Sequence, residues 1–197
     1  MEAFDWESRI REWSRKRIEY LIELEQEELP PEIMELGYLA YAGAIEEQIV
    51  AAEVRLGVTF PPSYRQFLKV SNGLRSTSDY GIHFYSTEEV EWHIVGYEEI
   101  VDYFMEPEQK PVTDEEYFVY GEEQCDLVFR PEYLDTAIEI SSEDEKSIFL
   151  LNPQIITQDD EWEAFFRSCI PPFSINRYRS FREMMEQIIF NAPEFPI

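Results

Sequence analysis

The sequence predicts an α+β fold: a central, mostly antiparallel β-sheet flanked by helices, with an extra helical arm at the N-terminus. Amphipathic helical patterns occupy both ends of the chain, and strand-like runs are grouped between them. A hydrophobic content of 44%, with aromatics at 15%, is enough to fill a core in a chain of 197 residues. These observations favour one large domain with an added arm.

The first predicted helix covers residues 5–29. Trp6, Ile10 and Trp13 recur there at spacings of four and three, which places them on one apolar side. The prolines of the following "LPPE" end the helix because proline cannot continue it. We expect this arm to pack on the main domain.

Two further helices are closed by turn-forming residues. Over residues 44–56 the spacing predicts a single buried stripe, formed by Ile45, Ile49, Ala52 and Leu56. The next helix lies in "FPPSYRQFLKVSNG", residues 60–73, where the prolines begin the helix and Asn72-Gly73 ends it. Its aromatic face predicts packing against the preceding helix and contains no nucleophile or ligand.

The middle of the chain contains the strand patterns. Residues 81–85, "GIHFY", alternate as a strand does, and a helix or helix pair is predicted over residues 90–104. Short strand-like runs follow at 117–120 and 126–130. Residues 136–152 form the clearest hairpin, because "SIFLL" is apolar on both faces, as an interior strand should be.

Two helices are predicted at the C-terminal end. Residues 159–168, "DDEWEAFFRS", have acids where the first helical turn favours them, and residues 169–179 are predicted to form a loop. Ser180 and Glu183 then have the spacing of a capping box before "FREMMEQIIF".

The charge excludes several functions. With 42 acids and 16 bases the formal net charge is −26, which argues against binding nucleic acid or anionic membranes through phosphate contacts. A basic protein partner is favoured, because opposite fields steer association. No apolar run is long enough for a membrane span or a signal peptide, so we expect a cytoplasmic protein.

The acids are concentrated in one stretch of the sequence. Residues 81–129 hold fourteen acids and one base, a net charge of −13. One interpretation is a solvated face of an acidic protein, and the other is an electronegative surface complementary to a basic toxin. For the second interpretation the candidate partner-binding residues are Glu88, Glu89, Glu91, Glu98, Glu99, Asp114, Glu115 and Glu116.

No catalytic, metal or cofactor motif is found. The two histidines, His83 and His93, lie in no activating motif with Ser or Cys, and the chain lacks Gly-rich phosphate loops and the spaced ligands of a calcium loop. We therefore predict no cofactor and no metal. A hydrolase that uses two carboxylates stays an alternative, because 42 acids can supply a pair by chance.

Three segments in this order resemble the Smi1/Knr4 (SUKH) superfamily. They are "IEEQIVAAEVRLGVTFPPSYRQFLKVSNG" at 45–73, "AIEISSEDEKSIFLLNP" at 137–153 and "EWEAFFRSCIPPFSINRYRSFREMMEQ" at 161–187. The resemblance places this domain at residues 42–197 and leaves 1–41 as the N-terminal helical arm.

The resemblance implies the α+β fold and a non-enzymatic protein-binding module. Bacterial members of the superfamily are mostly regarded as immunity proteins that neutralise toxins, many of them nucleases, whereas fungal members regulate cell-wall synthesis through protein contacts. It therefore implies an immunity protein, with a regulatory or scaffolding protein as the alternative.

Overall fold

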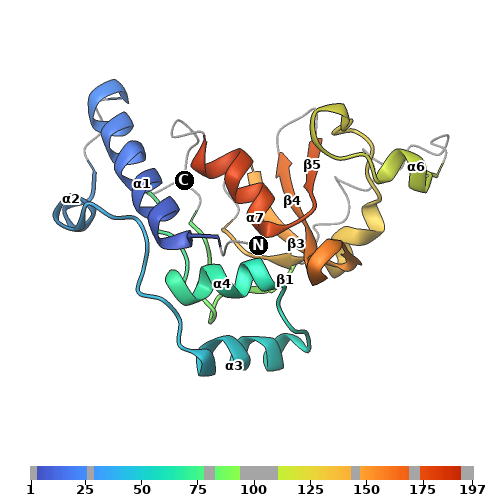
Figure 1. Ribbon diagram of the computed structural model, residues 1–197, viewed down its shortest axis with the longest axis horizontal. Coiled ribbons are helices and arrows are strands. Elements are labelled where there is room, and N and C mark those ends of the chain that lie inside the picture. The colour runs from blue at the N-terminus through green and yellow to red at the C-terminus, as the bar shows by residue number, and fades with distance from the viewer. Residues whose placement is uncertain are drawn as a thin grey trace. The chain divides into compact units, whose positions relative to one another are not determined.

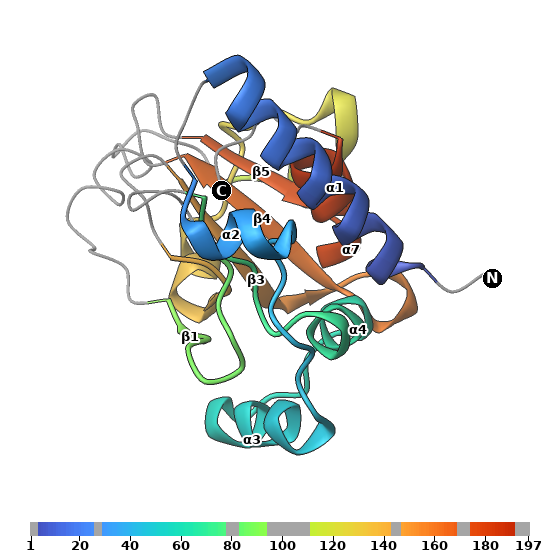
Figure 2. The same cartoon turned by 90° about the vertical axis from the view of Figure 1, so that its left-hand side faces the viewer.

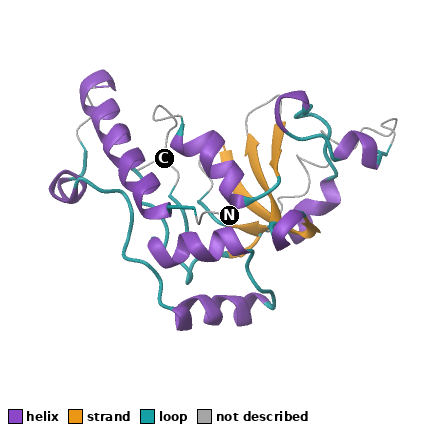
Figure 3. Ribbon diagram, in the orientation of Figure 1, coloured by secondary structure: helices purple, strands orange, loops and turns teal. Residues whose placement is uncertain are grey.

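The protein, seen here as a computed structural model, combines helices with one antiparallel sheet (Figures 1 and 3). The structure describes residues 4–25, 29–77, 83–93, 111–142, 147–168 and 174–191. Five strands are ordered β1-β2-β3-β4-β5, and every neighbouring pair is antiparallel, which confirms the predicted α+β class. The chain divides into two compact units, Met1–Glu89 with Met185–Ile197 (unit 1) and Val90–Met184 (unit 2). The domain boundary between residues 41 and 42 stays a prediction.

Unit 1 is helical. Its elements are α1 (Trp6–Tyr20), η1 (Leu21–Glu25), α2 (Pro31–Leu36), α3 (Glu46–Leu56), α4 (Pro62–Val70) and η5 (Met185–Phe190). The two η elements are π-helical turns. Helix α4 lies between α1 and α3 in two perpendicular views (Figures 1 and 2).

Aromatic rings form the core of unit 1. Trp6 and Trp13 are buried on α1, as their spacing predicts. The ring of Trp6 lies 5.6 Å from that of Phe67 on α4 and 6.0 Å from that of Phe190 on η5, in edge-to-face geometry. The helical stripe of the arm is therefore used for packing.

Two predictions near α3 and α4 need correction. Ile45 is 60% exposed, because α3 begins at Glu46 and Ile45 has an extended backbone just before the helix. The segment predicted as a strand at 81–85 makes only an isolated bridge between Leu74 and Phe84, while residues 81 and 82 lie outside the described residues. Gly73 adopts φ +96° there, with the Phe84 carbonyl too close for a Cβ atom.

Unit 2 contains the sheet. Its strands are β1 (Glu91–Trp92), β2 (Ile138–Glu139), β3 (Ser147–Ile156), β4 (Trp162–Ser168) and β5 (Ser174–Tyr178). The helical elements are α6 (Asp114–Tyr117), η2 (Gly121–Glu123), η3 (Pro131–Thr136), η4 (Gln158–Asp160) and α7 (Phe181–Met184). The predicted hairpin is confirmed as β2 and β3, and the helix predicted after Ser180 is confirmed as α7 with its continuation η5.

The helix predicted over residues 159–168 is wrong, because Trp162–Ser168 form strand β4. Residues 162–165 are buried without interruption, which suits a strand in the interior of a sheet and not a helix with one solvated side. The predicted loop at 169–179 is wrong as well, since Ser174–Tyr178 form β5 beside β4.

Two strands predicted at the end of the acidic stretch are not formed. Residues 117–120 do not form a strand, because Tyr117 ends the short helix α6, and residues 126–130 contain no strand either. Of the helix predicted over 90–104, only residues 90–93 are described; Glu91–Trp92 form strand β1, which pairs with β2, and residues 94–110 lie outside the described residues. In the two short strand-like runs the apolar spacing fitted either period.

Candidate functional site

The predicted partner-binding acids lie in both units. Glu88 and Glu89 belong to unit 1, and Glu91, Asp114, Glu115 and Glu116 belong to unit 2. Glu98 and Glu99 lie outside the described residues. That these acids form one surface therefore stays a prediction, and each unit is considered by itself.

The two acids of unit 1 differ in how free their carboxylates are. Glu89 accepts hydrogen bonds from the Ser86 amide at 2.9 Å and the Ser86 hydroxyl at 2.8 Å. Partial burial opposes its ionisation, but these bonds from Ser86 outweigh it, so the pKa of Glu89 is lowered. Glu88 is exposed and accepts one bond, from Gln48 on α3 at 3.2 Å. Glu89 therefore shapes its turn, and Glu88 remains available to a partner.

In unit 2, two of the acids hold local structure. Glu116 and Thr113 form a capping box at the start of α6, with bonds of 3.0 and 3.3 Å. Asp114 pairs with Arg130 at 2.5 Å, and this bond raises the pKa of the guanidinium. Glu115 and Glu91 are exposed and form no ion pair within the described ranges. Among the predicted acids of unit 2, these last two are the carboxylates that a partner can reach at least structural cost.

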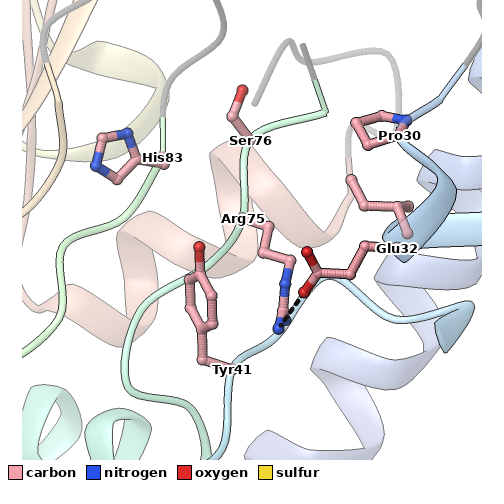
Figure 4. Close-up of a pocket in the computed structure, with 7 residues that line it drawn as sticks. Pro30, Glu32, Tyr41, Arg75, Ser76 and His83 are labelled. Carbon is pink, nitrogen blue, oxygen red and sulfur yellow. Dashed lines mark ion pairs between the residues drawn. The ribbon is translucent and has the colours of Figure 1, made fainter. Parts of the chain in front are cut away.

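A surface pocket in unit 1 was not expected from the sequence. It has a volume of about 320 Å³, and Figure 4 shows Arg75 between Tyr41 and Glu32 in its lining. The guanidinium stands 4.0 Å from the Tyr41 ring centre and 3.3 Å from the Glu32 carboxylate. His83 lies across the pocket. Because the one guanidinium already has a carboxylate partner, the described lining offers no unmatched charge to an ionic ligand.

The most enclosed carboxylate of unit 2 is Glu163 on β4, which is fully buried. It accepts hydrogen bonds from the Tyr117 hydroxyl at 2.7 Å, the Tyr120 hydroxyl at 2.8 Å and the Asn152 amide at 3.0 Å. Burial raises the pKa of Glu163, although these three donors oppose the rise. Both carboxylate oxygens are occupied, so this residue does not offer the open acid that the hydrolase alternative needs.

Arg177 on β5 extends this buried network. Its guanidinium is buried, lies 4.3 Å from the Tyr117 ring centre and donates to the Tyr117 carbonyl. Gln124 completes the arrangement: its side-chain oxygen accepts from the Arg177 amide at 2.7 Å, and its side-chain nitrogen donates to the Arg177 carbonyl at 3.1 Å. The network fastens the segment from α6 to η2 onto the sheet.

Each of the two histidines lies near a glutamate. His93 is buried and its Nδ1 lies 2.5 Å from the Glu139 carboxylate, across the pairing of β1 with β2. His83 is partly exposed, with Nε2 at 3.9 Å from Glu89. In the portions of the chain that the structure describes, no three His, Cys, Asp or Glu side chains gather as metal ligands, and no helix could cross a membrane.

Sequence reasoning missed the buried network and the outer surface of α3. Glu163 lies in the segment 159–168 that was predicted as a helix, so its burial was hidden by the wrong secondary structure. Val50 and Val54 are 42% and 76% exposed. The sequence prediction for this helix covered only its buried stripe. The apolar spacing of four between the two valines was the signal that could have found them.

The fold and these sites define an α+β protein whose polar groups mostly secure structure and whose exposed surface carries acids. The chain belongs to the SMI1 / KNR4 family (SUKH-1), whose model matches residues 43–187, more than half of the sequence. Proteins of this family are generally non-catalytic immunity or regulatory proteins, which implies a protein partner. No curated protein matches the chain significantly.

Proposed function

We propose that this chain is a cytoplasmic immunity protein that binds a basic toxin domain, such as a nuclease, and blocks it with an acidic surface. The charge of −26, half of which lies in residues 81–129, is the observation that carries the proposal. A nuclease must attract phosphate, so its active cleft is basic, and an acidic protein that covers the cleft gains both association rate and specificity.

The acids with open carboxylates support this mechanism best. Glu88, Glu91 and Glu115 are exposed and, among the described residues, have no ion pair, so a partner's lysines and arginines need not displace an internal base. Such exposed pairs contribute mostly to encounter rate, because solvent and salt screen them in the complex.

The first experiment uses the product of the gene next to the one that encodes this chain, because an immunity gene is expected beside its toxin gene. Expression of that product alone should stop growth, and co-expression of this chain should restore it. If the neighbouring product is harmless and does not bind, the immunity function is rejected, and a regulatory or scaffolding role becomes the better explanation.

The second experiment tests the charge mechanism with Glu115→Lys. This reversal should lower the association rate constant and flatten its dependence on salt, because it removes a steering charge. Glu35→Lys is the matched control: Glu35 is also exposed and changes the net charge equally, but lies outside the acidic stretch. Equal rates and equal salt slopes for the two variants would reject a local acidic surface.

A further inference from the structure

The outer face of α3 is apolar although the helix is already packed on its other side. Residues Glu47, Val50, Ala51 and Val54 are exposed at offsets of zero, three, four and seven, which places them on one helical face. Val54 is 76% exposed and Val50 42% exposed. The buried residues of α3 lie on its opposite face, and Figures 1 and 2 show α4 beside this helix.

The stability of the helix does not explain these valines. The packing of α3 uses a separate stripe that contains Ile49, Ala52 and Leu56, all of them buried. Valine is a poorer helix former than alanine, lysine or glutamate, because its branched side chain loses rotamer freedom. Exposed apolar side chains that adjoin on one face are a mark of interaction surfaces, whereas single ones are ordinary.

The face is held in a fixed position on unit 1. Glu46 pairs with Arg65 at 2.6 Å and with Lys69 at 3.0 Å, both on α4. The buried Glu53 also pairs with Arg65, at 2.9 Å. Arg55 donates to a backbone carbonyl of the neighbouring turn at 2.9 Å. A partner therefore meets a helix that is already ordered, which lowers the entropic cost of binding.

Two acids that form no ion pair with a described residue border the apolar face. Glu47 lies on it, and Glu88 is brought beside it by the hydrogen bond from Gln48. In the described part of the chain neither acid forms an ion pair, whereas Glu46 and Glu53 are neutralised by α4. An apolar centre with a charged rim is the usual anatomy of a protein interface. The rim here carries the open carboxylates of Glu47 and Glu88, and its base, Arg55, is engaged with the Thr87 carbonyl.

We propose that the outer face of α3, formed by Val50, Ala51 and Val54 with Glu47 and Glu88 at its rim, docks an apolar patch bordered by lysine or arginine on a basic protein. The inference rests on the proposed function and specifies where the toxin is held. A second copy of this chain does not fit, because a symmetric pair of these faces would oppose Glu47 and Glu88 of both copies, and each chain carries −26.

The test uses two substitutions at one exposed position, Val54→Glu and Val54→Arg, against the purified product of the neighbouring gene. Both variants lose the apolar contact, but only arginine also repels a basic rim. The dissociation constant should rise about tenfold for Val54→Glu and about a hundredfold for Val54→Arg. Leu36→Glu and Leu36→Arg are the controls, since Leu36 is 55% exposed on α2 of the same unit, and they should change affinity less than about twofold.

Outcomes separate the two proposals. If the partner binds and both Val54 variants bind as the wild type does, or if Val54→Arg binds more tightly than Val54→Glu, the α3 face is rejected while the immunity function stands. Circular dichroism checks that each variant is folded, which we expect because the side chains at positions 54 and 36 are exposed.

A second measurement is used if the product of the neighbouring gene does not bind this chain. A photo-crosslinking amino acid at position 54 of the full chain, in native cells, should join a basic protein identified by mass spectrometry, and the same group at position 36 should not. A basic partner that is not toxic supports the α3 face and rejects immunity. A crosslink to a second copy, to an acidic protein, or at position 36 alone overturns the inference, as does no crosslink at position 54.

Discussion

Removal of the Glu163 carboxylate tests the buried network most directly. Glu163→Ala leaves three donors without their acceptor, and two of them, Tyr117 and Asn152, are fully buried. At about 1–3 kcal/mol for each buried donor left unsatisfied, the free energy of unfolding should fall by about 2–6 kcal/mol. Tyr120 is half-buried and can turn to water, so it adds little.

Glu163→Gln is the matched variant, because it keeps the shape and one acceptor oxygen. Its amide nitrogen can donate to a tyrosine hydroxyl, which can accept as well as donate. We expect a loss of only about 1 kcal/mol, the typical net value of one hydrogen bond. Urea unfolding at pH 7, followed by circular dichroism and tryptophan fluorescence, measures both. If the glutamine variant loses as much as the alanine variant, or if neither loses stability, unsatisfied donors are not what makes Glu163 important.

Three further predictions follow from burial, backbone geometry and the sheet edge. Burial raises the pKa of Glu163 above 4.5, so the contribution of its protonation to stability is full below about pH 4.5 and is lost as pH rises through the pKa of the folded state. The free energy of unfolding of the wild type, relative to that of Glu163→Gln, should therefore fall between pH 4.5 and pH 7 in urea unfolding. A difference that stays constant over this range would contradict the prediction. Gly73→Ala should lower the melting temperature clearly more than Gly57→Ala does. Both glycines have positive φ, a conformation that costs alanine about 1–2 kcal/mol. Of the two, only at Gly73 would the new Cβ lie 2.5 Å from a backbone oxygen. Gln124→Ala should lower the free energy of unfolding by about 1–2 kcal/mol and speed hydrogen exchange at the Arg177 amide, because both bonds to Arg177 are lost. Unchanged exchange at this amide would show that Gln124 does not protect the edge strand β5.

The sequence was most informative where a periodic pattern was long and bounded by turn residues. The α4 segment begins at its prolines and ends before Gly73, and Tyr64 and Phe67 are buried on the expected face. The hairpin of β2 and β3 was found for the same reason, because its apolar runs flank a polar turn.

Tertiary context decided the segments that sequence reasoning misassigned. "DDEWEAFF" fits a helix start by its acids, but from Trp162 on it forms β4, whose neighbours β3 and β5 cover it on both edges and bury Glu163 together with the aromatic rings. No local pattern reports that a glutamate will be met by Tyr117 and Tyr120, because those partners stand more than 40 positions earlier. The acid-rich stretch was predicted as a surface, yet Asp114 and Glu116 are engaged in local structure.

The edge of the sheet at β5 narrows the ways in which a partner can bind unit 2. An open edge strand invites another chain to add a strand. Here the chain closes the edge itself: Gln124 meets the amide and carbonyl of Arg177 as a neighbouring strand would, and the Ile175 amide donates to the Asp126 carbonyl at 2.9 Å. Strand addition at β5 would have to break these bonds first. Recognition through side chains on helices and turns, such as α3 and Glu88, carries no such cost, and the acids that steer a basic partner lie on elements of that kind.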